Sequence, residues 1–287
     1  MAAPTATLLI TSRDRAGIIA AISNLLYSHG CNIINSDQHT EEQDGRFFWR
    51  IFLASERLGL DQFRALLSQN LEALLPDIGI KWELHDSAHR DRMVILVSLQ
   101  PHCMMDLLSR HHFRELEADL AAVISNHPDM EPMVRAFGIP FTLIPVERAH
   151  KAEAEAALLA ALRELKCDTL VLARYMQVLS GDFLRAWGKP IINIHHSFLP
   201  AFAGNSPYRQ AYERGVKLIG ATAHYVSEEL DAGPIIAQAT IEVSHRDLPR
   251  DLALKGKDAE VMVLAKAVRD HLQKRVFIHQ NRTIVFD

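Results

Sequence analysis

Residues 190–200 read PIINIHHSFLP, and this stretch decides how the larger part of the chain folds. The run from Ile191 to Ile194 is apolar except for Asn193, a pattern typical of a short buried strand. A strand points residues i and i+2 to the same face, so Asn193 and His195 are predicted to project side by side. An amide N–H suits a developing oxyanion, and an imidazole can donate a hydrogen bond and move a proton near neutral pH.

A carboxylate joins this pair from a later turn. Asp231 lies in the sequence EELDAG at residues 228–233, far enough along the chain for one intervening helix and strand. A carboxylate beside an imidazole holds its orientation and favours its charged form. We therefore predict that Asn193, His195 and Asp231 are the catalytic groups. The alternative for Asn193 and His195 is a structural cap at the end of a strand.

The segments on both sides of this stretch alternate between strand and helix patterns. Strands are expected at residues 93–98, 119–125, 140–144, 169–173, 218–226 and 235–243, and helices at residues 102–112, 131–137, 151–165, 208–214 and 258–274. A hairpin is expected at residues 276–286. This alternation predicts an α/β domain with a Rossmann-like, mainly parallel sheet, in which ligands bind outside the carboxyl ends of the strands.

The first part of the chain has a different order of elements. Strand patterns at residues 5–11, 32–39, 46–54 and 79–85 and helical patterns at residues 18–26 and 60–75 give the order βαββαβ. This order predicts a ferredoxin-like domain at residues 1–86. Residues 86–91 are polar and aperiodic, as in a linker, so a catalytic domain is expected at residues 92–287.

Composition excludes several classes of partner. The net charge of −4 over 287 residues gives no broad nucleic-acid footprint, so no nucleic acid partner is expected. No run approaches the ~20 apolar residues that cross a bilayer, and the start lacks a basic, apolar leader, so we expect no membrane partner and a cytoplasmic location. The three cysteines are far apart and are expected to be reduced. The 15 histidines show no metal-ligand spacing, so no metal site is predicted.

Further motifs carry a resemblance to a known family. These are SFLP at residues 197–200, GATAHY at residues 220–225 and LDAGP at residues 230–234. With them, the second domain resembles the folate-dependent formyltransferase family, and the whole chain is most similar to the deformylases of that family. Those members carry an N-terminal ACT domain, and DRAGI at residues 14–18 and NIINSDQ at residues 32–38 look like its opening.

The resemblance implies a substrate and a set of site residues. The substrate would be 10-formyltetrahydrofolate, split by water into formate and tetrahydrofolate without a permanently bound cofactor, which supplies formate for purine synthesis and balances one-carbon folate pools. The predicted catalytic residues fall on the catalytic Asn, His and Asp of the family. Matched positions predict a folate site formed by Arg174, Tyr175, Met176, Gln177, Val178, Leu179, Tyr225, Val226 and Glu229.

Three other histidines are candidates for the site of the attacking water. His196 follows the catalytic pair, and His102 and His224 occur in two of the motif regions. Each is expected either to line the water site or to make ordinary hydrogen bonds on a partly buried surface.

The N-terminal domain has two interpretations. As in other ACT domains, Asp14, Gly17, Ile18 and Asn35 are expected to bind an amino-acid effector, glycine or methionine, with backbone groups holding its carboxylate and amine. The alternative is a scaffold that only supports assembly. A homo-oligomer, dimer or tetramer, is expected in both cases.

The choice between hydrolase and transferase depends on the turn after the first strand of the second domain. Residues 99–106 read LQPHCMMD, where phosphate-binding members of the family have small residues. Proline removes an N–H donor and the side chains are bulky, so water is expected to be the nucleophile rather than a phosphorylated acceptor. No additional basic domain for a transfer RNA is expected, which weakens the prediction of a transfer RNA substrate. Residues 203–208 lack the basic residue that many deformylases carry near position 206.

Two other functions are compatible with the same residues. One is a formyl transferase that acts on an unidentified amine, and the other is a folate or amino-acid binding protein without catalysis. Formate release from 10-formyltetrahydrofolate alone would distinguish the hydrolase from both.

Overall fold

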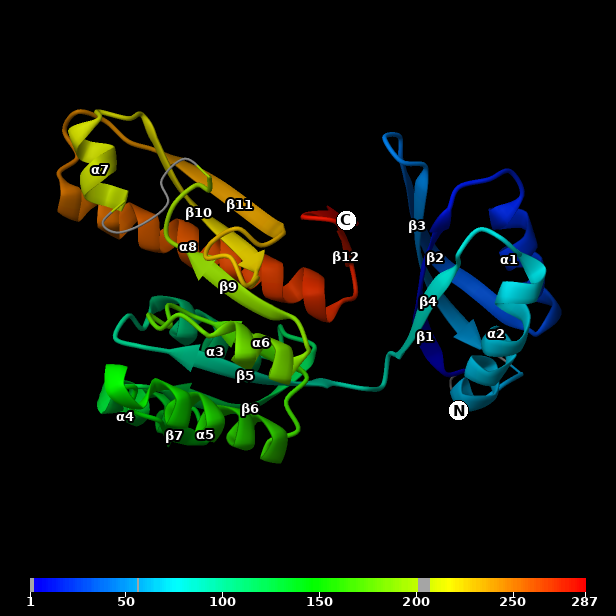
Figure 1. The fold of residues 1–287 in the computed structure, drawn as a ribbon, viewed down its shortest axis with the longest axis horizontal. Coiled ribbons are helices and arrows are strands. Elements are labelled where there is room, and N and C mark those ends of the chain that lie inside the picture. The colour runs from blue at the N-terminus through cyan, green and yellow to red at the C-terminus, as the bar shows by residue number, and fades with distance from the viewer. Residues whose placement is uncertain (1–2, 56, 201–206) are drawn as a thin grey trace. The chain divides into compact units, whose positions relative to one another are not determined.

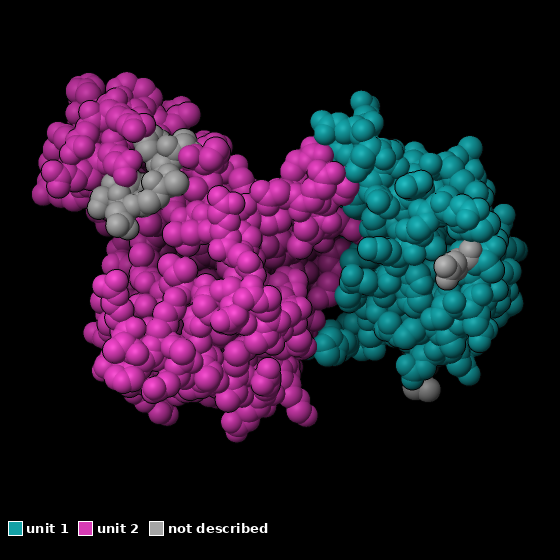
Figure 2. Space-filling model, in the orientation of Figure 1, with its two compact units in different colours: residues 1–90, 286–287 teal, residues 91–285 magenta. Residues whose placement is uncertain are grey.

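The computed structural model describes residues 3–55, 57–200 and 207–287. The chain divides into two units, which Figure 2 colours separately. Unit 1 consists of Met1–Arg90 with Phe286–Asp287, and unit 2 consists of Asp91–Val285. No helix in the described ranges is both long and apolar enough to cross a membrane.

Unit 1 has the predicted ferredoxin-like order. Its elements are β1 (Thr5–Arg13), α1 (Ile18–Ser28), β2 (Cys31–Glu41), β3 (Arg46–Ser55), α2 (Leu60–Leu74) and β4 (Lys81–Asp86). The strands form an antiparallel sheet in the order β2-β3-β1-β4. Alternate residues of β1 and β3 join the apolar sides of both helices in one core, as expected for a sheet with one face covered.

Unit 2 is built on a seven-stranded sheet (Figure 1). The elements of its first half are β5 (Asp91–Val97), α3 (His102–His112), β6 (Ala118–Ser125), the 3-10 turn Pro128–Met130, α4 (Glu131–Ala136), β7 (Phe141–Leu143), the 3-10 turn Arg148–His150, α5 (Lys151–Glu164) and β8 (Thr169–Leu172). The second half has α6 (Gly181–Trp187), β9 (Ile191–His195), α7 (Pro207–Glu213), β10 (Leu218–Tyr225), β11 (Ile235–Glu242), α8 (Pro249–Leu272) and the hairpin β12 (Val276–His279) and β13 (Arg282–Val285).

The sheet of unit 2 is mainly parallel, which confirms the predicted fold class. Its order is β11-β10-β9-β8-β5-β6-β7, and the pairs from β9 to β7 are parallel, whereas β10 and β11 are antiparallel. Because β9 is parallel to β8 and β5, the carboxyl ends of these three strands lie at one edge of the sheet. Asn193 and His195 lie in the last three residues of β9, so the fold places them at this edge.

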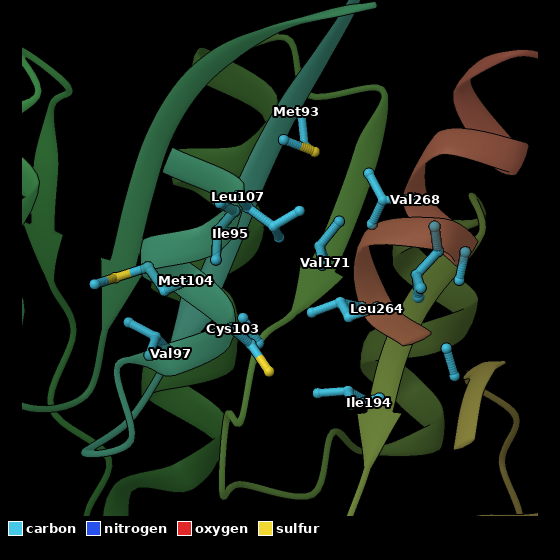
Figure 3. Close-up of a cluster of buried hydrophobic side chains, with 14 of the residues drawn as sticks. Met93, Ile95, Val97, Cys103, Met104, Leu107, Val171, Ile194, Leu264 and Val268 are labelled. Atoms are coloured by element: carbon cyan, nitrogen blue, oxygen red, sulfur yellow. The ribbon is translucent and has the colours of Figure 1, made fainter. Parts of the chain in front are cut away.

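Apolar clusters cover both faces of this sheet. On one face, α3 and α8 pack against β5, β8, β9 and β10, and Figure 3 shows Leu107 of α3 with Leu264 and Val268 of α8 in this cluster. On the other face, Leu158 and Leu162 of α5 and the aromatic side chains of α6 pack against β5 and β8. Strands buried on both faces read as nearly continuous apolar runs, which is why β5 and β8 could be predicted from the sequence.

Two helices differ from the sequence-based prediction. The seven-residue α6 was not predicted because it is too short to show a helical period, although its Ser180 cap, which accepts a hydrogen bond from the backbone N–H of Phe183, and the following Gly188 are helix signals. Helix α8 begins at Pro249 rather than near residue 258, because Gly256 interrupts its apolar pattern. The loop at residues 203–208 contains no basic residue in the sequence. Residues 203–206 of this loop lie outside the described residues.

Candidate active site

A pocket with a volume of about 260 Å³ lies at the carboxyl ends of β8 and β9. The loop after β8 forms one side of it, and the loop after β10 forms another. All three predicted catalytic residues line this pocket: Asn193 and His195 from β9, and Asp231 from the loop after β10. The sheet therefore brings together residues that are far apart in the chain, as expected at the carboxyl edge of an open α/β sheet.

His195 and Asp231 form a pair inside the pocket. The Nδ1 atom of His195 lies 3.2 Å from Oδ1 of Asp231, and their side chains are only 7% and 15% exposed. The hydrogen bond from His195 lowers the pKa of Asp231, although partial burial acts in the opposite direction. The Nε2 atom of His195 is buried and has no hydrogen-bond partner among the described residues. Since Nδ1 is held by the carboxylate, Nε2 is the atom left for a substrate.

Asn193 is held by a second histidine. Its Nδ2 atom lies 3.1 Å from Nε2 of His224, whose Nδ1 lies 2.9 Å from the carbonyl oxygen of Tyr225. A carbonyl oxygen can only accept, so Nδ1 of His224 carries the proton and Nε2 accepts from Asn193. Burial lowers the pKa of His224, consistent with a neutral ring. Within the described ranges the second N–H of the Asn193 amide has no partner, so it can donate to a ligand.

The pairing of β9 with β10 produces this contact. The two strands are antiparallel, with His224 opposite Asn193 and Thr222 opposite His195. Side chains directly opposite each other in such a pair lie on the same face of the sheet. The sequence alone did not reveal this neighbour of Asn193, because strand register is a long-range property.

The loop after β8 supplies the predicted folate side of the pocket. Arg174, Tyr175, Met176, Gln177, Val178 and Leu179 all line it. Ser98 at the end of β5 fixes the start of this loop, because its N–H donates to the Arg174 carbonyl at 3.2 Å and its hydroxyl accepts from the Met176 N–H at 3.0 Å. Met176 and Val178 are more than half exposed, so they offer apolar surface to a flat ligand.

Two of the three candidate water-site histidines line the pocket, and one does not. His224 and His196 do, and the ring centroid of His196 is 5.1 Å from that of His195. Burial, with the charges of Arg174 and His195, lowers the pKa of His196 to about 4, so this ring is neutral at neutral pH. His102 lies outside the pocket because its Nε2 points from α3 to the Glu260 carboxylate on α8, 2.8 Å away.

Comparisons with known proteins match this architecture in both units. Residues 91–268 match the formyl transferase family, and residues 6–68 match the ACT domain family. The formyltetrahydrofolate deformylase of Synechocystis sp. is 45% identical over 285 residues, which is 98% of each chain. That of Mycobacterium tuberculosis is 48% identical over 281 residues, covering 97% of this chain and 90% of the relative. The chain belongs to the formyltetrahydrofolate deformylase family.

Solved structures agree with this membership. The formyltetrahydrofolate deformylase of Pseudomonas syringae superimposes with a TM-score of 0.94 at 44% identity, covering 99% of this chain and 95% of that chain. The glycinamide ribonucleotide transformylase of Symbiobacterium toebii gives a TM-score of 0.66 at 31% identity and covers 71% of this chain. The deformylase family therefore shares the whole two-unit chain, whereas the transformylase matches a smaller part.

Two residues predicted to bind folate do not line the pocket of this deformylase-family chain. Tyr225 is 4% exposed and packs in the core between the sheet and α8, with its hydroxyl 2.8 Å from Nδ1 of His271. The cause is strand alternation: His224 and Val226 face the pocket, so Tyr225 faces away. Glu229 does not line the pocket either, whereas its neighbours Ser227, Glu228 and Leu230 do. Val226 lines the pocket as predicted.

A buried carboxylate next to the pocket was missed by the sequence-based prediction. Glu260 of α8 is 1% exposed and is reached by Nε2 of His102, by the Tyr208 hydroxyl at 2.8 Å and by Nε of Arg174 at 3.4 Å. Burial would raise its pKa, but the hydrogen bond from His102, the charge of Arg174 and the Tyr208 hydroxyl together lower it. Glu260 follows Lys257 and Asp258 in α8, so the local sequence gave no sign that its side chain points inward.

The same cluster includes the only set of potential metal ligands found among the described residues, His102, Cys103 and Glu260. Burial raises the pKa of the Cys103 thiol, which disfavours the thiolate that a metal needs. Arg174 already supplies a positive charge to Glu260. The cluster is therefore poorly suited to a cation, and the prediction of no metal site stays a prediction.

The four predicted effector residues lie around the start of α1 and on β2 in unit 1. The Asp14 carboxylate accepts a hydrogen bond from the Thr40 hydroxyl at 3.0 Å, and Asn35 is exposed beside an irregularity in the β2–β3 pairing. Gly17 precedes α1 with a φ of 92°, a left-handed conformation that favours glycine. The Ile18 side chain is buried in the core, so only its backbone can face an effector.

Proposed function

We propose that this protein hydrolyses 10-formyltetrahydrofolate to formate and tetrahydrofolate, with Asn193, His195 and Asp231 as its catalytic groups. The observation that carries this proposal is the unpartnered Nε2 of His195, buried in a pocket beside an amide donor and backed by a carboxylate. The folate is the substrate, and no permanently bound cofactor is needed, because the chemistry is hydrolysis of one C–N bond.

The first step is attack of water on the formyl carbon. The new C–O bond leaves negative charge on the formyl oxygen, which Nε2–H of protonated His195 and Nδ2–H of Asn193 stabilise. Removing one such donor typically costs ~100 to 1,000-fold in rate. Because Asp231 has a lowered pKa, it remains ionised and stabilises the charged form of His195.

The second step breaks the bond between the formyl carbon and N10. N10 must take up a proton to leave as an amine, and the attacking water must lose one. Asp231, through a bridging water, is the base that accepts the proton of the nucleophile and returns it towards N10. General acid and base catalysis of this kind contributes ~100 to 10,000-fold. The products are formate and tetrahydrofolate.

Water is the nucleophile because the neighbouring turn is unsuited to a phosphorylated acceptor. The first turn of α3, which would bind such a phosphate through its N–H groups, begins after Pro101. Bulky side chains follow in that turn at His102, Cys103 and Met104, where a phosphate cradle needs small residues. The transferase alternative therefore requires an acceptor without phosphate.

Unit 1 is proposed to bind glycine or methionine and to mediate assembly of a dimer or tetramer. Among the described residues no side chain caps the first turn of α1, so its N–H groups after Gly17 are available to the carboxylate of an amino acid. Asp14 and Asn35 supply polar side chains for its amine. Ile34 on the edge strand β2 and Tyr27 on α1 are 51% and 81% exposed, which supports an interface with a second copy.

The proposed location is the cytoplasm, where the formate serves purine synthesis and folate pools are balanced. The three cysteines are buried free thiols, which suits a reducing compartment.

The direct test is to incubate the purified protein with 10-formyltetrahydrofolate and no amine acceptor. We expect equimolar formate and tetrahydrofolate. Formate that forms no faster than in the absence of protein, or transfer of the formyl group only when an amine is added, would reject the hydrolase. Binding of the folate without turnover would favour the non-catalytic alternative.

A further inference from the structure

A second cavity, with a volume of about 400 Å³, adjoins the active-site pocket in unit 2. It is lined by residues from α3, α7 and α8 and from the ends of β5, β8 and β9: Gln100, His102, Arg174, His196, Tyr208, Ala253, Lys257 and Glu260. Arg174 and His196 line both cavities. These two side chains therefore form the wall that the cavities share, and His196 directly follows His195 in the chain.

Arg174 places a guanidinium at this wall, paired with Glu260 only through its Nε atom in the described part of the chain. Its side chain is 13% exposed, its Nε lies 3.4 Å from Glu260, and this Nε makes no hydrogen bond within the described part of the chain. Its backbone φ is 64°, an uncommon conformation for a non-glycine residue, and its carbonyl is held by the Ser98 N–H. A planar guanidinium matches the two oxygens of a carboxylate.

Lys257 adds a second positive charge to the cavity. It lies one turn before Glu260 on α8 and is partly buried, and no ion pair of its ammonium group is found in the described ranges. Without counting the histidines, two cations face one carboxylate in this cavity. The excess positive charge favours a small anion.

We propose that this second cavity binds formate and releases it, so that formate and tetrahydrofolate leave through different openings. The inference rests on the proposed function, which generates formate at His195. When the C–N bond breaks, tetrahydrofolate still covers the loop after β8, whereas Arg174 lies between the new carboxylate and the second cavity. Formate passes to the guanidinium of Arg174 and then towards Lys257. The positive charges of these side chains attract it, so its release does not require tetrahydrofolate to leave first.

Double product inhibition tests whether the two products bind at the same time. Initial rates are measured with formate and tetrahydrofolate varied together, at constant ionic strength. Separate openings predict that the reciprocal-rate plots intersect, because a complex with both products forms. Parallel plots, which indicate mutually exclusive binding, would overturn the proposal.

A charge-removing variant tests the position of the formate site. Lys257→Ala is expected to raise the inhibition constant of formate about 10-fold, as loss of a charge-assisted contact does. Lys217→Ala, which removes an exposed lysine outside both cavities, is the matched control and should leave that constant unchanged. Equal inhibition constants in the wild type and Lys257→Ala would contradict the assignment.

Formate binding can also be measured without turnover. Line broadening of ¹³C-formate by the full-length protein, in the presence of tetrahydrofolate, should occur in the wild type and weaken in Lys257→Ala. If the wild type broadens the signal but releases no formate from 10-formyltetrahydrofolate, the proposed function fails and the anion site stands. If turnover occurs without such broadening, the exit site is wrong and the hydrolase stands.

Discussion

Three histidines of the active-site pocket differ in their hydrogen-bond partners and surroundings. Nδ1 of His195 faces the Asp231 carboxylate, whose pKa is lowered by this hydrogen bond. His224 donates to a backbone carbonyl and is buried, which keeps it neutral. His196 is buried beside Arg174, which also keeps it neutral. Two neutral rings therefore lie beside His195, whose Nδ1 is nearer to the Asp231 carboxylate than Nε2 of His224 is.

The role of His224 as a positioning residue can be tested by two substitutions. His224→Phe removes the acceptor of the Asn193 amide, so the amide can rotate and its donor is lost from the pocket for part of the time. We expect kcat to fall by roughly 10 to 100-fold, less than the ~100 to 1,000-fold for loss of an oxyanion donor, with little change in KM. His224→Gln retains an acceptor and should restore most of kcat. Equal kcat values in both variants would exclude this role.

The lowered pKa of His196 predicts how stability depends on pH. An unfolded histidine titrates near 6.5, whereas the pKa of folded His196 is lowered to about 4. Between these values the unfolded chain binds a proton that the native protein does not, so native stability decreases as the pH falls from 6.5 to 4.

Between pH 6.5 and pH 4, the free energy of unfolding of His196→Gln should therefore fall less than that of the wild type. The difference should reach up to roughly 3 kcal/mol. Urea unfolding at a series of pH values measures the difference. His112→Gln is the control, because His112 lies on the surface end of α3. The same pH dependence in wild type and His196→Gln would show that His196 is protonated in the native state.

At the scale of elements, the loop between β10 and β11 positions Asp231 by a close backbone approach. A Cβ atom at Gly233 would lie 1.8 Å from the carbonyl oxygen of Tyr225, which itself accepts from His224. Asp231 has a φ of 56°, so the loop turns sharply at the proposed catalytic carboxylate. Glycine at position 233 therefore lets the loop return to β10 with Asp231 inside the pocket.

Gly233→Ala is expected to displace this loop and to reduce kcat more than 10-fold, because a misplacement of about 1 Å can cost up to ~100-fold. The measurement is kcat together with the far-ultraviolet circular dichroism spectrum, which should stay native. Gly59→Ala is the matched control, since a Cβ there has open space around it. Wild-type kcat in Gly233→Ala would show that the loop tolerates a side chain.

The elements also show what the sequence could and could not predict. Apolar strands such as β5 and β8 and the amphipathic α3 were predictable because their burial is encoded locally. Strand alternation predicts that Tyr225 faces away from the pocket. The folate-site prediction included Tyr225 because the family resemblance extends over its whole segment. The contact of Asn193 with His224 and the inward position of Glu260 depend on register and helix packing, which no local pattern encodes.

For the whole molecule, the effector proposal connects unit 1 with turnover. Glycine or methionine is expected to change the rate of formate release by the full-length protein, and Asp14→Asn should weaken this response at least 10-fold by removing a polar group of the proposed site. Asp61→Asn, an exposed carboxylate at the start of α2, is the control. No response to either amino acid in the wild type would leave unit 1 with only a scaffold role.

The measurement that tests the central claim most directly is formate release by Asp231→Asn. This substitution preserves the volume of the side chain but removes the negative charge that faces Nδ1 of His195. We predict a loss of ~100 to 10,000-fold in kcat, with unchanged thermal unfolding and unchanged affinity for tetrahydrofolate. Turnover equal to that of the wild type in this correctly folded variant would contradict hydrolysis by Asn193, His195 and Asp231.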